Sequence, residues 1–84
     1  MQVNFITSGE KYKRQSVSKK SYRAFLEDDE ITIMRTEDNI KHSHTNIQEG
    51  KTRLRCGEKE WLILSFYYPQ KRPRYLIAKV KEVI

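Results

Sequence analysis

The chain lacks the features that mark several large protein classes. It has 84 residues, a single cysteine, Cys56, and no long apolar run, the longest being Trp61 to Leu64. One cysteine cannot form an internal disulfide, and this run is far below the roughly 20 apolar residues of a membrane-spanning helix. We therefore expect a protein of a reducing compartment that has no membrane contact.

The segment Met1 to Ile6 is too short, and too free of positive side chains, to read as a signal peptide. The expected location is therefore cytoplasmic. Apolar residues are also scarce: Ala, Val, Ile, Leu, Met, Phe, Trp, Cys and Gly together make 29 of the 84 residues, below the roughly 45–50% of an average soluble domain. Together with the length, this excludes a dinucleotide-binding fold or a catalytic barrel and favours one small domain over residues 1–84.

Apolar residues gather near the C-terminus, where alternation and turn residues predict three strands. The expected strands are Lys51–Cys56, Trp61–Tyr68 and Tyr75–Ile84, joined as an antiparallel meander over residues 51–84. Trp61–Tyr68 is apolar or aromatic on both faces, which is typical of a central strand covered on two sides. The core is expected to lie mostly in this C-terminal part.

The sequence before residue 51 has fewer patterns that predict secondary structure. Gln2–Ile6 and Glu30–Met34 are short strand candidates, and residues 35–49 suit a long surface loop. Tyr22, Phe25 and Leu26 at i, i+3 and i+4 predict one short helix near 18–28. The fold class expected is therefore α+β and β-dominated, a small antiparallel sheet or partly open barrel of about four to five strands.

The clearest functional signal is positive charge. The chain has 17 Lys and Arg against 11 Asp and Glu, a formal net charge of +6. The cations form three groups: one with no acid between Lys11 and Arg23, one face of the strand at 51–56, and one hairpin tip. Tyrosines are interleaved with them. The candidate contact residues are Lys13, Arg14, Lys19, Lys20, Lys51, Arg53, Arg55, Tyr67, Lys71, Arg72, Arg74 and Tyr75.

Cations mixed with aromatic residues on a sheet suit nucleic acid. Lysine and arginine neutralise phosphates, and aromatic rings stack on unpaired bases. The first interpretation is therefore a non-catalytic module that binds RNA or single strands, with Arg53 and Arg55 as phosphate contacts and Tyr67 and Tyr75 as stacking platforms. The alternative is a small regulator or inhibitor that meets an acidic protein surface with the same cations. A strand edge can also pair with a second copy of the chain, and Tyr75–Ile84 is the expected edge.

Metal and nucleophile chemistry have weaker signals. His42, His44, Cys56 and Glu49 could be imagined as ligands, but their spacing is not that of a structural zinc site and a second cysteine is missing. We expect no metal, no cofactor and no catalytic residue.

Two resemblances point toward RNA. The run from Arg53 to Gly57, followed by the strand Trp61 to Phe66, is similar to the C-terminal half of RelE-type ribonuclease toxins, which implies RNA cleavage and an antitoxin partner. Residues 1–50 depart from the two long helices of that family, so its catalytic residues are not carried over. The run Gly50 to Arg55, with the strands after it, looks like part of the ASCH group of PUA-like barrels. A small ribonuclease using Arg53, Arg55 and His42 or His44 is therefore a second alternative.

Overall fold

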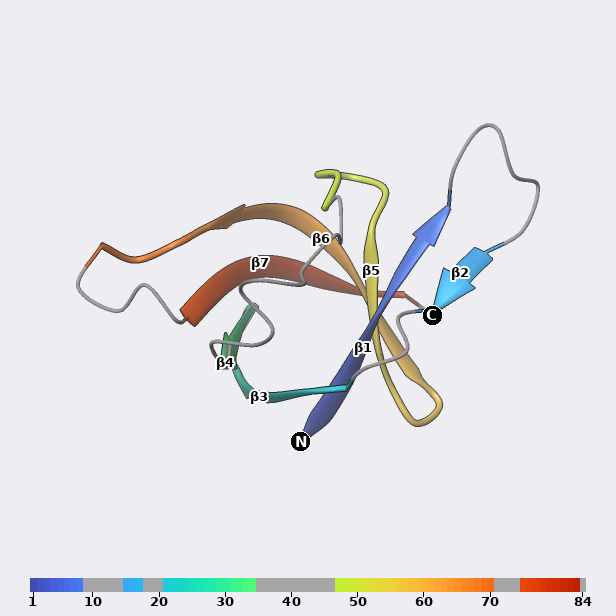
Figure 1. The fold of residues 1–84 in the computed structure, drawn as a ribbon, viewed down its shortest axis with the longest axis horizontal. Helices are drawn as coiled ribbons and strands as arrows, with labels where there is room; N and C mark the ends of the chain where they lie inside the picture. The colour runs from blue at the N-terminus through green and yellow to red at the C-terminus, as the bar shows by residue number, and fades with distance from the viewer. Residues whose placement is uncertain (9–14, 18–20, 35–46, 71–74, 84) are drawn as a thin grey trace.

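The computed structural model describes residues 1–8, 15–17, 21–34, 47–70 and 75–83. These residues form seven strands and no helix, so no helix among them could span a membrane. The strands are β1 (Gln2–Ser8), β2 (Gln15–Val17), β3 (Tyr22–Glu27), β4 (Glu30–Met34), β5 (Arg53–Cys56), β6 (Lys59–Tyr67) and β7 (Tyr75–Val83) (Figure 1). The prediction of a β-dominated fold is therefore confirmed.

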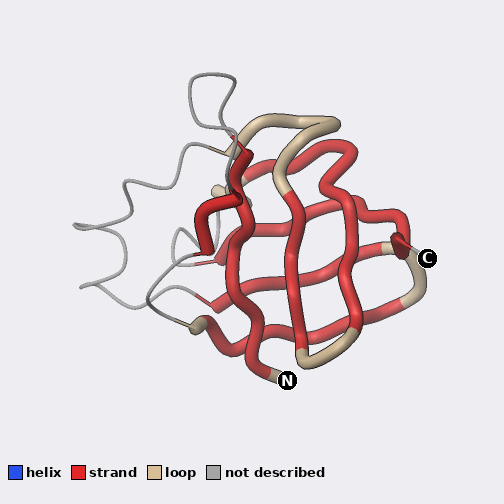
Figure 2. The backbone as a smooth tube through the Cα atoms, turned by 90° about the vertical axis from the view of Figure 1, so that its right-hand side faces the viewer, coloured by secondary structure: helices blue, strands red, loops and turns tan. Residues whose placement is uncertain are grey.

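Six of the strands close into an antiparallel barrel. Their order is β1-β3-β4-β7-β6-β5, and β5 returns to pair with β1. Asn4, Phe5 and Ile6 of β1 lie opposite Arg55, Leu54 and Arg53 of β5, which closes the barrel. Figure 2 shows the strands in front crossing those behind. The short β2 extends the sheet beside the C-terminal half of β1. The expected small sheet or partly open barrel of about four to five strands is thus corrected to a closed barrel of six strands among the described residues.

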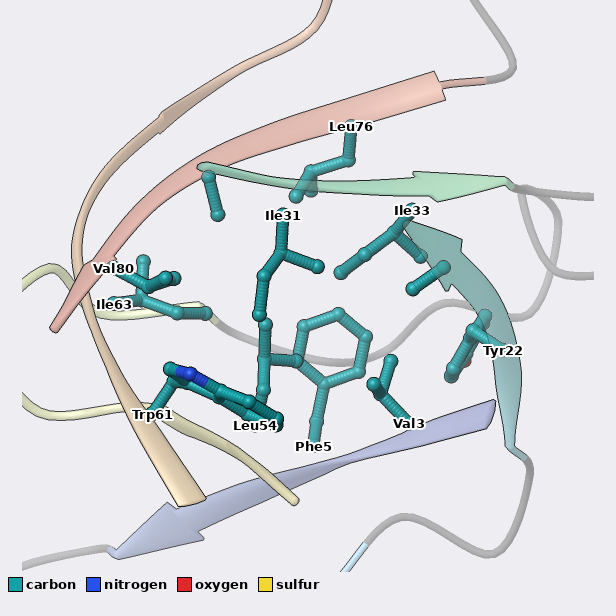
Figure 3. Close-up of a cluster of buried hydrophobic side chains, with 12 residues drawn as sticks. Val3, Phe5, Tyr22, Ile31, Ile33, Leu54, Trp61, Ile63, Leu76 and Val80 are labelled. Carbon is teal, nitrogen blue, oxygen red and sulfur yellow. The ribbon is translucent and has the colours of Figure 1, made fainter. Parts of the chain in front are cut away.

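Alternation along every barrel strand builds the core. Successive side chains of a strand point to opposite faces, so every second residue enters the barrel. The interior holds twelve buried side chains, and Figure 3 shows them converging between the six strands; they are Val3, Phe5, Tyr22, Ala24, Ile31, Ile33, Leu54, Trp61, Ile63, Leu76, Ala78 and Val80. Half come from residues before position 35. The expectation of a mostly C-terminal core is therefore wrong.

The predicted helix is wrong over residues 22–27, which form β3. Tyr22 and Ala24, two residues apart, point into the barrel, whereas Phe25 is 56% exposed. The helical spacing of Tyr22, Phe25 and Leu26 was therefore coincidental, because the side chains that are buried follow a period of two. The positive φ of Asp28 (54°) begins the two-residue turn into β4, and aspartate tolerates this conformation better than most residues. Residues 18–20 lie outside the described part.

The C-terminal meander is confirmed, with two corrections. β7 is paired with β4 on one side and β6 on the other, so it is not an edge strand, and the edge expected at Tyr75–Ile84 for a second copy is absent over Tyr75–Lys79. β6 is central, but only its inner face is covered, because Leu64 and Tyr67 are exposed on the other side. A register shift at Leu64 lets Phe66 return to the inner face after Ile63.

The barrel depends on the single buried leucine of its shortest strand. Leu54 of β5 is fully buried and lies opposite both Phe5 and Trp61. Leu54→Ala should lower the free energy of unfolding by about 2–5 kcal/mol, since it leaves a cavity where the barrel closes. Urea unfolding measures this loss.

The matched control is Leu64→Ala, since Leu64 is 42% exposed. This variant should cost less than about 1 kcal/mol. Equal losses for the two leucines would contradict the closed barrel.

Candidate nucleic-acid interface

The turn before β5 determines which way its arginines point. Thr52 is buried, and its side-chain Oγ1 accepts a hydrogen bond from the backbone N–H of Gln48 at 2.8 Å. The backbone N–H of Ile63 donates to the carbonyl of Thr52 at 2.9 Å, which joins the turn to β6. With Thr52 and Leu54 facing inward, Arg53 and Arg55 must face outward, as the alternation predicted.

Both outward arginines bind one carboxylate. Arg55 lies directly opposite Glu60 of β6 and donates from Nε at 3.3 Å and from Nη2 at 3.0 Å to Oε1. Arg53 donates from Nη1 to the other oxygen, Oε2, at 3.3 Å. We call these three residues the arginine fork. The side chains of both arginines are 38% exposed, and that of Glu60 is 22% exposed.

The arginine fork keeps Glu60 ionised. Its hydrogen bonds with Arg55, followed by those with Arg53 and the charges of both, lower the pKa of Glu60 below its ordinary value of 4.5, against the opposing effect of desolvation. At neutral pH the arginine fork therefore carries a net charge of +1 rather than +2. The sequence analysis missed Glu60, although the turn at 57–58 would have placed it opposite Arg55.

The hairpin of β6 and β7 brings the two predicted stacking tyrosines together. Tyr67 lies opposite Ile77, and Tyr75 is two residues before Ile77 on the same strand, so all three share the outer face. Tyr67 is 55% exposed, and Tyr75 is half-buried beside its β4 partner, Met34. Figure 1 shows the end of β6 and the start of β7 at the left of the view, beyond β3 and β4.

The opposite face of the same hairpin is also aromatic. Phe66 lies opposite Ala78 and packs against the core, and Tyr68 contacts Phe66 edge to face at 6.0 Å between ring centroids. Tyr68 is therefore near Tyr67 in the sequence but lies on the other side of the hairpin. This difference provides a matched control for the outer face.

The net positive charge is not in the described residues. They contain seven Lys and Arg against eight Asp and Glu, a net charge of −1. The remaining positions contain ten Lys and Arg against three Asp and Glu, a net charge of +7. The two parts together give the net charge of +6 of the whole chain. Seven of the twelve candidate contact residues are among these positions and so lie outside the described part: Lys13, Arg14, Lys19, Lys20, Lys71, Arg72 and Arg74.

The strand ends that flank these positions meet at one end of the barrel. Since neighbouring strands are antiparallel, β1, β4 and β6 end where β3, β5 and β7 begin. The other end holds the turns at 28–29 and 57–58, and the first of these is wholly acidic from Glu27 to Glu30. Its one described ion pair joins Asp29 to Lys79 at 3.9 Å. The charge distribution is therefore asymmetric along the barrel.

The structure separates the predicted contacts into groups. Tyr67 and Tyr75 lie together on the β6–β7 hairpin, whereas Arg53 and Arg55 lie on β5, and Lys51 is exposed in the turn before it. No group of three or more His, Cys, Asp or Glu among the described residues could hold a metal ion. Cys56 is half-buried and unbridged, and His42 and His44 lie outside the described part.

The pKa of Glu60 tests the arginine fork directly. It should lie below 4.5, and Arg55→Ala should raise it more than Arg53→Ala, because the hydrogen bonds from Arg55 make the larger contribution. A depressed pKa stabilises the folded state at neutral pH, and this contribution is lost as the pH falls through the pKa of Glu60. A ¹³C NMR titration of the Glu60 carboxyl group measures its pKa in the unmodified protein, in Arg53→Ala and in Arg55→Ala. A pKa that Arg55→Ala leaves unchanged would contradict the arginine fork.

Comparison with known proteins adds no family to these observations. No family model, curated protein or solved structure matches the chain. The resemblances to ribonuclease toxins and to ASCH barrels therefore stay predictions. The function must be inferred from the side chains, burial and charge of the barrel itself.

Proposed function

We propose that this protein binds single-stranded nucleic acid, with RNA as the first choice, through the outer face of the β6–β7 hairpin. One observation carries the proposal: the hairpin brings Tyr67 and Tyr75 to one face, and the sequence between these two tyrosines contains Lys71, Arg72 and Arg74.

The aromatic residues supply the contact with bases. Every base has a flat π-face, so stacking on tyrosine contributes about 1–3 kcal/mol per base without requiring a particular sequence. Tyr67, 55% exposed on the outer face, offers its ring to such a base. Duplex bases are already stacked on one another, which is why unpaired strands are favoured.

The cations supply the contact with phosphates. A barrel body with a net charge of −1 attracts polyanions little by itself, so long-range attraction must come from the positions that carry the net +7. In the sequence, most of these positions follow the ends of β1, β4 and β6, which lie at the same end of the barrel as Tyr67 and Tyr75. The acidic turn from Glu27 to Glu30 lies at the opposite end and repels phosphate there.

Fluorescence anisotropy of labelled single-stranded RNA, single-stranded DNA and duplex DNA tests the proposal. Affinity should be highest for a single strand and should fall steeply between about 50 and 200 mM salt, because each neutralised phosphate releases a counterion. Tyr67→Ala should weaken binding roughly 5- to 150-fold, the equivalent of one lost stacking contact. Tyr67→Phe keeps the ring and should bind nearly as well as the unmodified protein.

The control is Tyr68→Ala, because Tyr68 is nearly as exposed as Tyr67 (47% against 55%) but lies on the other side of the hairpin, against Phe66. It should leave the affinity unchanged. An equal loss for Tyr68→Ala and Tyr67→Ala would contradict a contact on the outer face of the hairpin. Binding weaker than the roughly 10⁻⁴ M of non-specific association would contradict the function itself and direct the search to an acidic protein partner.

A further inference from the structure

The arginine fork on β5 and β6 has the composition of an anion site that is already occupied. Two guanidinium groups on alternate positions of one strand hold a single carboxylate, each binding a different oxygen. We propose that this is a phosphate-binding site of the protein and that Glu60 occupies it as an internal competitor. This inference rests on the proposed function, because nucleic-acid phosphate is the ligand that would displace Glu60.

The donor geometry suits phosphate. Guanidinium groups match the oxygens of carboxylates and phosphates equally, since both present pairs of acceptors to the planar donor fork. Arg53 uses only Nη1 and Arg55 only Nε and Nη2 toward Glu60. At 38% exposure, both side chains remain accessible from solvent.

The position of Glu60 makes it a competitor rather than part of the ligand site. It is opposite Arg55 in the sheet, so it is present at a high effective concentration and holds both arginines without a separate association step. Its pKa is lowered below the ordinary value by the two arginines, so the carboxylate is ionised at neutral pH. An anionic ligand can therefore bind Arg53 and Arg55 only by displacing the ionised carboxylate of Glu60.

Glu60→Gln removes the competing charge and keeps the shape of the side chain. Its affinity for a single-stranded oligonucleotide should rise roughly two- to tenfold, the equivalent of gaining two exposed ionic contacts. The slope of log affinity against log salt should steepen by about 0.7 for each additional phosphate bound. Adding Arg53→Ala and Arg55→Ala to this variant should abolish both gains.

The matched control is Glu58→Gln, an exposed acid in the turn of the same hairpin with the same change in net charge. It should change the affinity much less than Glu60→Gln, and the salt slope not at all. Equal effects of the two variants would show that only net charge matters and would overturn the proposal. Circular dichroism confirms that each variant remains folded.

A second measurement separates this inference from the function proposed above. Inorganic pyrophosphate is titrated into the unmodified protein and into Glu60→Gln while the side-chain Nε–H of Arg55 is followed by NMR. A shift that saturates at lower pyrophosphate concentration in Glu60→Gln supports the arginine fork even if no nucleic acid binds. Identical titrations in the two proteins would refute the proposal that Glu60 competes with phosphate for the arginine fork, even if nucleic acid binds at the hairpin.

Discussion

The pairing of β1 with β5 is the constraint on which the rest of the structure depends. Without it the six strands would form an open sheet with two unprotected edges, and an 84-residue chain has too few apolar residues to bury such a sheet well. Closure lets twelve side chains fill one interior, with Leu54 meeting Phe5 across the closing pair. Since β5 is only four residues long, this one leucine fixes the face on which the flanking arginines appear.

The outer surface follows from this closure. Arg53 and Arg55 point to solvent because Leu54 must be inside, and the register of the β5–β6 hairpin then places Glu60 opposite Arg55. The same rule, applied to the β6–β7 hairpin, places Tyr67 and Tyr75 on one outer face. Two kinds of surface therefore arise on neighbouring parts of one sheet: an aromatic face on the β6–β7 hairpin, and an arginine pair already neutralised in part by its own acid.

Period-two patterns made much of the fold predictable from the sequence. Glu30–Met34 and the C-terminal meander have few alternatives, because their apolar residues alternate and turn residues separate them. β3 could not be identified from the sequence, because the spacing of Tyr22, Phe25 and Leu26 fits a helix. Only the structure shows that the buried side chains of this segment are Tyr22 and Ala24, two residues apart as in a strand. The arginines were predicted to face outward, but Glu60 was missed, because its role depends on the register of two strands rather than on either strand alone.

The central claim is that nucleic acid contacts the outer face of the β6–β7 hairpin and avoids the acidic turn from Glu27 to Glu30. The most direct test is to titrate a single-stranded RNA oligonucleotide into ¹⁵N-labelled protein and map the backbone amide shifts. The account predicts that the largest shifts cluster around Tyr67 and Tyr75, with little change from Glu27 to Glu30. Shifts centred on the acidic turn, or spread evenly over the barrel, would contradict it.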